Sequence, residues 1–82
     1  MNGRPAKHSV TLKGHRTSIS LEEDFWQALR AIAARQDKPI NALVAEIDVA
    51  RGTGMGLASA IRVYVLRDLQ AQITTNAPKK TT

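Results

Sequence analysis

The chain of 82 residues contains no cysteine, which excludes disulfides and thiolate metal sites. Only His8 and His15 remain as soft ligands, and no carboxylate lies near them in the sequence, so we predict no metal site and no cofactor. No stretch approaches the roughly 20 apolar residues of a membrane span, and the N-terminus lacks an apolar signal region. We therefore expect a cytoplasmic protein without a membrane partner.

A chain this short buries little apolar surface unless disulfides, a metal or a second copy help. Because the sequence argues against the first two, it predicts an oligomer. Catalysis is not expected: Ser18 and Ser20 lie near His15, but no carboxylate is positioned to orient a nucleophile.

Acidic residues are absent from residues 1–16, which carry a charge of +4. The net charge of the whole chain is +5. Residues 17–50 carry −3 and residues 51–82 carry +4. A positive charge concentrated in this way favours a polyanionic partner, and nucleic acid suits it better than a membrane. The alternative is that the charge only keeps a small protein soluble.

A strand is predicted at about 15–21, where apolar and polar residues alternate. One face carries Thr17, Ile19 and Leu21, and the other carries Arg16, Ser18 and Ser20. Since every later periodic segment follows helical spacing, the predicted partner is the same strand of a second copy, in an antiparallel ribbon about a two-fold axis. Such a ribbon has about the width that the DNA major groove admits.

The segment before this strand is expected to stand apart from the ribbon. Residues 1–8 are predicted to form a mobile basic arm. Val10 and Leu12 alternate as in a strand, but their parity is opposite to that of Ile19 and Leu21. Gly14 marks a break, which could be a bulge, a bend or a tight turn, and we expect the segment from Val10 to Leu12 to form a separate arm.

Three amphipathic helices are predicted, at about 22–36, 39–51 and 57–73, within a single domain at 9–73. The glycine-rich run 52–56 is expected to be a linker rather than a phosphate-binding loop, and 74–82 a disordered tail. The apolar positions expected to form the dimer core are Thr17, Ile19, Leu21, Phe25, Leu29, Ile32, Leu43, Val44 and Ile47. The fold class is therefore mostly α with one short strand (α+β).

With its strand and two following helices, the chain resembles the ribbon-helix-helix family of DNA-binding proteins, of the Arc and methionine-repressor kind. In detail it resembles short bacterial members that carry the motifs found here at residues 14–22, at Phe25 and Trp26, and in a third helix at 60–66. The resemblance implies a homodimer, with higher oligomers on DNA, in which the ribbon enters the major groove.

By this resemblance, the base contacts fall on Arg16, Ser18 and Ser20. Arginine can bond to guanine O6 and N7, and serine hydroxyls tolerate several bases. The family also implies a phosphate at the start of the second helix, near Lys38, Ile40 and Asn41. Lys13 and His15 flank the ribbon and are expected to contact phosphates. The expected phosphate contacts are therefore Lys13, His15, Lys38, Ile40 and Asn41.

Other roles remain open for single residues and for the whole chain. Ser20 with Glu23 also matches a capping box, Arg16 could be a solvated charge on a strand edge, and Asn41 could be an inert helix residue. The most direct functional hypothesis is a transcriptional repressor or autoregulator that binds double-stranded DNA. The alternatives are an antitoxin whose third helix and tail bind a protein, and a dimeric adaptor module that does not bind DNA.

Overall fold

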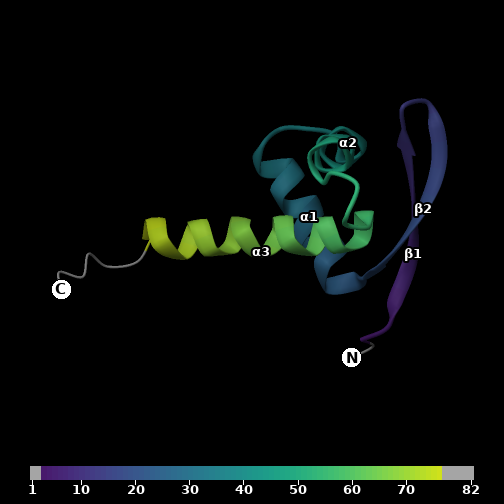
Figure 1. Cartoon of the computed structure of the whole chain (residues 1–82). Coiled ribbons are helices and arrows are strands. Elements are labelled where there is room, and N and C mark those ends of the chain that lie inside the picture. The colour runs from purple at the N-terminus through teal and green to yellow at the C-terminus, as the bar shows by residue number, and fades with distance from the viewer. Residues whose placement is uncertain (1–2, 77–82) are drawn as a thin grey trace.

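The computed structural model describes residues 3–76 and contains a two-stranded sheet followed by three helices (Figure 1). The predicted α+β class is confirmed. The elements are β1 (Pro5–Leu12), β2 (His15–Glu22), α1 (Glu23–Arg35), α2 (Ile40–Ala50) and α3 (Leu57–Asn76). Residues 1–2 of the expected arm and 77–82 of the expected tail lie outside the described part of the chain.

The partner of β2 is β1 of the same chain, in an antiparallel hairpin. The prediction that β2 finds no strand partner within its own chain is wrong, because β1 is that partner. Lys13 and Gly14 form a two-residue loop with φ of 53° and 79°. Positive φ at both loop positions is what a type I′ hairpin turn requires, and this turn matches the twist of the strands.

The change of parity across Gly14 is a consequence of this hairpin. Leu12 faces His15, Val10 faces Thr17 and His8 faces Ile19. With a two-residue loop, an even-numbered residue always faces an odd-numbered one, and facing residues share one side of the sheet. Val10 and Ile19 are therefore both buried, and the expectation of a separate arm from Val10 to Leu12 is wrong, because these residues pair with β2. Likewise, residues 5–8 of the expected arm belong to β1.

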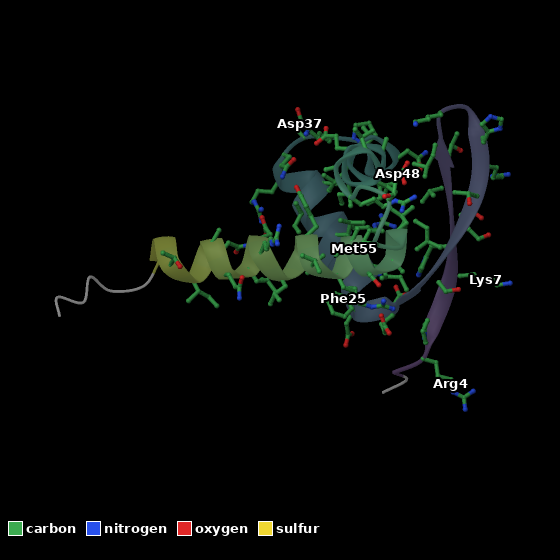
Figure 2. The ribbon with its side chains drawn as sticks, in the orientation of Figure 1. Arg4, Lys7, Phe25, Asp37, Asp48 and Met55 are labelled. Atoms are coloured by element: carbon green, nitrogen blue, oxygen red, sulfur yellow. The ribbon has the colours of Figure 1, made fainter. Side chains whose placement is uncertain are left out.

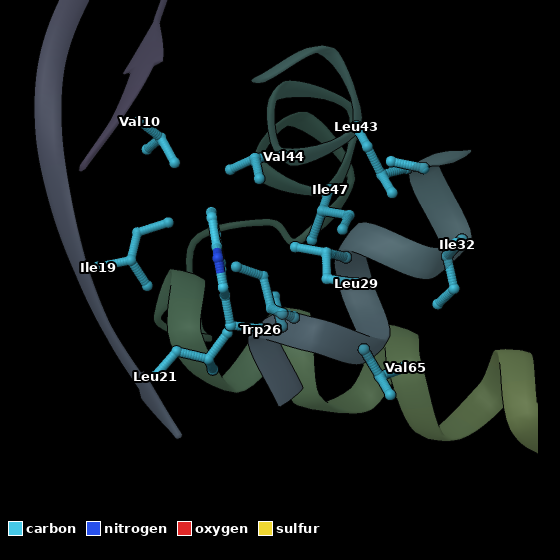
Figure 3. Close-up of a cluster of buried hydrophobic side chains, with 13 residues drawn as sticks. Val10, Ile19, Leu21, Trp26, Leu29, Ile32, Leu43, Val44, Ile47 and Val65 are labelled. Atoms are coloured by element: carbon cyan, nitrogen blue, oxygen red, sulfur yellow. The ribbon is translucent and has the colours of Figure 1, made fainter. Parts of the chain in front are cut away.

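The inner face of the hairpin packs on the helices in one apolar core (Figure 3). Figure 3 shows Val10, Ile19 and Leu21 pointing from the strands toward Trp26 and the helices. The buried members of the core are Val10, Ile19, Leu21, Trp26, Leu29, Ile32, Ala33, Leu43, Val44, Ile47, Ala60, Ile61 and Val65.

Seven of the nine residues expected in a dimer core are thus buried inside one chain: Ile19, Leu21, Leu29, Ile32, Leu43, Val44 and Ile47. The other two differ. Thr17 is exposed, although Ile19 on the same face is buried, and Phe25 is only half-buried. Trp26, which is not one of the nine residues expected in the core, is 8% exposed and belongs to the core.

The helix ends follow from local chemistry. Glu23 and Asp24 occupy the first turn of α1, where the helix dipole favours acids. Glu22 is the N-cap and no side chain caps the helix, so the capping box expected from Ser20 and Glu23 is not formed. Pro39 is the N-cap of α2, and its fixed φ suits a helix start.

In the view of Figure 1 the long helix α3 lies below α2 and crosses α1, and its second half projects away from the hairpin. Two ion pairs attach it to the rest of the chain: Arg62 Nε lies 2.8 Å from Glu22 Oε1, and Arg35 Nη2 lies 2.6 Å from Asp68 Oδ1. The helix continues to Asn76, three residues beyond the predicted end. On the projecting half, Leu66, Leu69 and Ile73 are 47–67% exposed.

Candidate nucleic-acid interface

The outer face of the hairpin is a polar surface built from both strands. The register places Lys7 opposite Ser20, Ser9 opposite Ser18 and Thr11 opposite Arg16. Because facing residues share one side of a sheet, all six side chains lie on the side away from the core, and all six are exposed. Figure 2 shows Lys7 extending from the strand away from the helices.

This surface carries two cations and four hydroxyls and no carboxylate among its six members. None of the six side chains makes a hydrogen bond or an ion pair with any other residue that the structure describes. Their donors are therefore available to an outside partner. Arg16, Ser18 and Ser20 thus share one exposed face, together with three residues of β1.

The turn end of this surface lies beside the start of α2. The backbone N–H of Thr11 donates to Asn41 Oδ1 at 3.2 Å, which joins β1 to the first turn of the helix. The N–H groups of Ile40 and Asn41 cannot bond within the helix because they belong to its first turn, and no backbone bond outside the helix uses them. These two donors therefore lie near Thr11, which faces Arg16.

The other three residues expected to contact phosphates differ in their surroundings. Lys13 in the turn and His15 at the start of β2 are exposed and lie at the same end of the hairpin. Lys38 instead places its Nζ 2.6 Å and 2.8 Å from the carboxylate oxygens of Glu46. Its charge is directed to α2 rather than to the hairpin.

Lys7, Ser9 and Thr11 were not predicted from the sequence to lie on the polar face. The signal that could have found them was the Lys13-Gly14 pair, because a two-residue loop ending in glycine between alternating segments is typical of a hairpin. Once the loop is fixed, the register and the face of every β1 residue follow.

A histidine holds β1 on the helices. The His8 ring stacks on the Trp26 indole with 4.2 Å between ring centroids and an interplanar angle of 13°. His8 Nε2 lies 3.3 Å from Glu23 Oε1, but the atom is buried and has no hydrogen-bond partner among the described residues. The His8 side chain is therefore attached to α1 by its stack on Trp26 and not by a hydrogen bond.

The opposite end of the hairpin is attached to α3 through Glu22. The pKa of the Glu22 carboxyl lies below its usual value of 4.5. The main cause is the side-chain hydrogen bond from Arg62, and the second is a hydrogen bond to the Glu22 backbone. Arg62 also lies over the Phe25 ring, 5.9 Å from its centroid. Arg62 therefore connects the end of β2, the first turn of α1 and α3.

The candidate interface is an exposed surface and not a pocket. A cavity of about 410 Å³ lies between α2 and α3, lined by Ile47, Met55 and Tyr64 among others, and no hairpin residue borders it. Within residues 3–76, no three metal-ligating side chains gather at one place. No helix in this part of the chain is both long and apolar enough to cross a bilayer.

Comparison with known proteins gives one match. A family model described as a ribbon-helix-helix domain matches residues 5–69, which include both strands, α1, α2 and most of α3. No curated protein and no solved structure matches the chain.

Proposed function

The chain belongs to the ribbon-helix-helix family of DNA-binding regulators, and from this premise we propose that it is a sequence-specific transcriptional repressor or autoregulator. It would act on double-stranded DNA in the cytoplasm. The observation that carries the proposal is the set of six exposed residues on the outer face of the β1–β2 hairpin, which comprises two cations and four hydroxyls and no acid.

The chemistry of this face suits base recognition. Arg16 can donate two hydrogen bonds to guanine O6 and N7, the most common specific contact in the major groove. The hydroxyls of Ser18 and Ser20 can donate or accept and so adapt to different bases. Arg16 is therefore the residue expected to discriminate most strongly between sequences.

Phosphate contacts would fix the orientation of the hairpin on the duplex. The N–H groups of Ile40 and Asn41 belong to the first turn of a helix, where the helix dipole favours an anion. Lys13 and His15 add donors at the same end of the hairpin. Lys38 would have to leave Glu46, at 2.6 Å, before it could join them.

We further propose that the protein acts as a homodimer. Exposed apolar side chains on α3 (Leu66, Leu69 and Ile73) form a stripe at helical spacing, and contiguous exposed apolar surface is typical of an interface. The outer edge of β2 offers a second surface, since its backbone makes no hydrogen bond to another described segment. Sedimentation equilibrium with Leu69→Glu would test the α3 stripe, because a charge there should shift the protein toward monomer.

The deciding experiment is selection of bound duplexes from a random pool, followed by affinity measurement with Arg16→Ala. Loss of a bidentate contact should cost about 1–3 kcal/mol, or roughly 5- to 150-fold in affinity, and should relax base preference at one position. Arg30→Ala is the matched control, because Arg30 is exposed on α1 and should leave the preference unchanged.

Two results would contradict the proposal. One is duplex binding that does not weaken as salt rises, since phosphate neutralisation requires that it does. The other is an unchanged sequence preference in Arg16→Ala.

A second candidate is a protein-binding role, as an antitoxin or an adaptor, and the observation that favours it is the same stripe on α3. In this case Leu69→Glu would abolish binding of a protein partner while the isolated protein remained monomeric. A dimer that dissociates in Leu69→Glu would instead favour the homodimer.

A further inference from the structure

We infer that the cavity between α2 and α3 is a binding site for a small carboxylate with an apolar body. The cavity has a volume of about 410 Å³, and ligand sites in proteins have volumes of roughly 300–1,000 Å³. No residue of the hairpin borders the cavity, so this inference does not depend on the proposed DNA contacts.

Apolar side chains from both helices and from the segment between them line the cavity. Ile47 of α2 and Ala60 of α3 are buried, Val63 of α3 is half-buried, and Met55 between the helices is exposed. A methionine side chain adapts to ligands of different shape, because it is unbranched and polarizable. This lining favours a ligand with an aliphatic or aromatic body.

The charged residues that border the cavity leave one positive charge unbalanced within the described part of the chain. Glu46 pairs with Lys38, whose Nζ lies 2.6 Å from Oε2, and Arg51 pairs with Asp48 at 2.8 Å. Arg67 makes no hydrogen bond or ion pair with any residue that the structure describes. One unpaired cation beside apolar walls suits a ligand with a single negative charge.

The acid next to Arg67 in the sequence does not supply that negative charge. Asp68 accepts a hydrogen bond from Arg35 Nη2 at 2.6 Å on one carboxylate oxygen, and from Gln72 Nε2 at 2.6 Å on the other. The guanidinium of Arg67 therefore remains available to an outside anion.

Tyr64 provides a second donor on the same side of α3. It borders the cavity together with Arg67, and residues three apart are neighbours on a helix surface. Tyr64 Oη accepts a hydrogen bond from Gln36 Nε2 at 3.1 Å, and this bond does not use the phenolic proton. Tyr64 and Arg67 are thus both suited to donate to one carboxylate.

Other classes of ligand fit the cavity less well. A cation would be repelled by Arg67 and would have to displace Lys38 from Glu46. An inorganic anion such as phosphate would leave the apolar lining without a partner. A carboxylate with an apolar body satisfies both parts of the site.

The test titrates straight-chain carboxylates into the full chain and follows two side chains of the cavity by NMR. Tyr64 is the only tyrosine and Met55 is one of two methionines, so Met55→Leu assigns the second signal. Trp26 does not border the cavity, and its indole signal reports whether the fold is intact.

We expect octanoate to bind saturably, with one molecule per chain, and to shift the signals of Tyr64 and Met55. The affinity should rise about fourfold for each methylene between butanoate and octanoate, because each buried methylene adds to the transfer free energy. Octylamine has the same body with the opposite charge and should bind at least about tenfold more weakly than octanoate.

The substitution Arg67→Gln separates the role of the charge from a general loss of structure. It should weaken octanoate binding by about fivefold, as expected for an exposed ion pair, and should not weaken octylamine binding. Arg30→Gln is the matched control, because Arg30 is exposed on α1 and does not border the cavity. This control should leave the affinity for octanoate unchanged.

The inference would be overturned if octanoate produced no saturable shift at Tyr64 and Met55, or if octanoate and octylamine bound equally. Equal losses in Arg67→Gln and Arg30→Gln would also overturn it, because the attraction would then be to the net charge of the chain. If dilution of the protein alone shifted both signals and octanoate did not, a second copy would cover the cavity, and the ligand site would be wrong.

Discussion

The substitution Gly14→Ala offers the most direct test of the turn that joins β1 to β2. Gly14 has φ of 79°, a left-handed conformation that costs a residue with a Cβ about 1–2 kcal/mol. A Cβ at this position would meet no atom within 4 Å, so no clash adds to this cost. Alanine also restricts the unfolded chain, which offsets about 0.4–1 kcal/mol.

The expected net loss is therefore about 1 kcal/mol in the free energy of unfolding, or a fall of roughly 4–8 °C in Tm for a domain of this size. Gly54→Ala is the matched control: Gly54 has the same open surroundings without a left-handed φ, so its substitution should leave stability unchanged or raise it by up to about 1 kcal/mol. Gly14→Asn should lose less than Gly14→Ala, because asparagine tolerates the left-handed region.

The assay is urea unfolding followed by the fluorescence of Trp26, the only tryptophan in the chain. Trp26 stacks on His8 of β1, so its emission reports on the docked hairpin. If Gly14→Ala were as stable as Gly54→Ala, the turn would carry no conformational requirement. The left-handed turn conformation at Gly14 would then be refuted.

Two further predictions concern the contacts that hold the hairpin at its ends. The Arg62 bond lowers the pKa of Glu22 in the folded protein below 4.5. This contact therefore stabilises the protein fully at pH values above the pKa of Glu22 in the unfolded chain, and the stabilisation is lost as the pH falls through the lowered pKa of the folded protein. The stability gap between wild type and Glu22→Gln, measured by urea unfolding from pH 3 to 7, should therefore narrow below about pH 4.5, and a constant gap would contradict the role of Arg62. At His8, the Nε2 atom is buried without a hydrogen-bond partner, so His8→Phe should keep the stack on Trp26 and leave stability equal or about 1 kcal/mol higher. His8→Ala should lower it by roughly 1–2 kcal/mol, and equal stability of the two variants in the same assay would show that the stack contributes nothing.

Local periodicity was sufficient to predict the helices and the face of β2. Ile19 and Leu21 are buried as the alternation required, while Arg16, Ser18 and Ser20 are exposed. These assignments depend only on the two-residue period of a strand, which holds whatever the strand pairs with. The class of the fold followed from the same patterns.

Long-range packing decided what periodicity could not. Phe25 and Trp26 are adjacent in α1, and the helical pattern favoured Phe25 for the core. Trp26 is buried instead, and His8, eighteen residues earlier in the chain, stacks on its indole. Lys38 likewise looked available for a phosphate until α2 brought Glu46 within 2.6 Å of it.

The sequence by itself determined the charge asymmetry, the polar face of β2 and the amphipathic helices, because these depend on residue type and on spacing within a few neighbours. Only the tertiary structure decided which strand pairs with β2. That choice depends on the backbone conformation of Lys13 and Gly14 and on the core contacts of Val10 and His8. The hairpin places Lys7, Ser9 and Thr11 on the same face as Arg16, because a loop of two residues fixes the register of every pair beyond it.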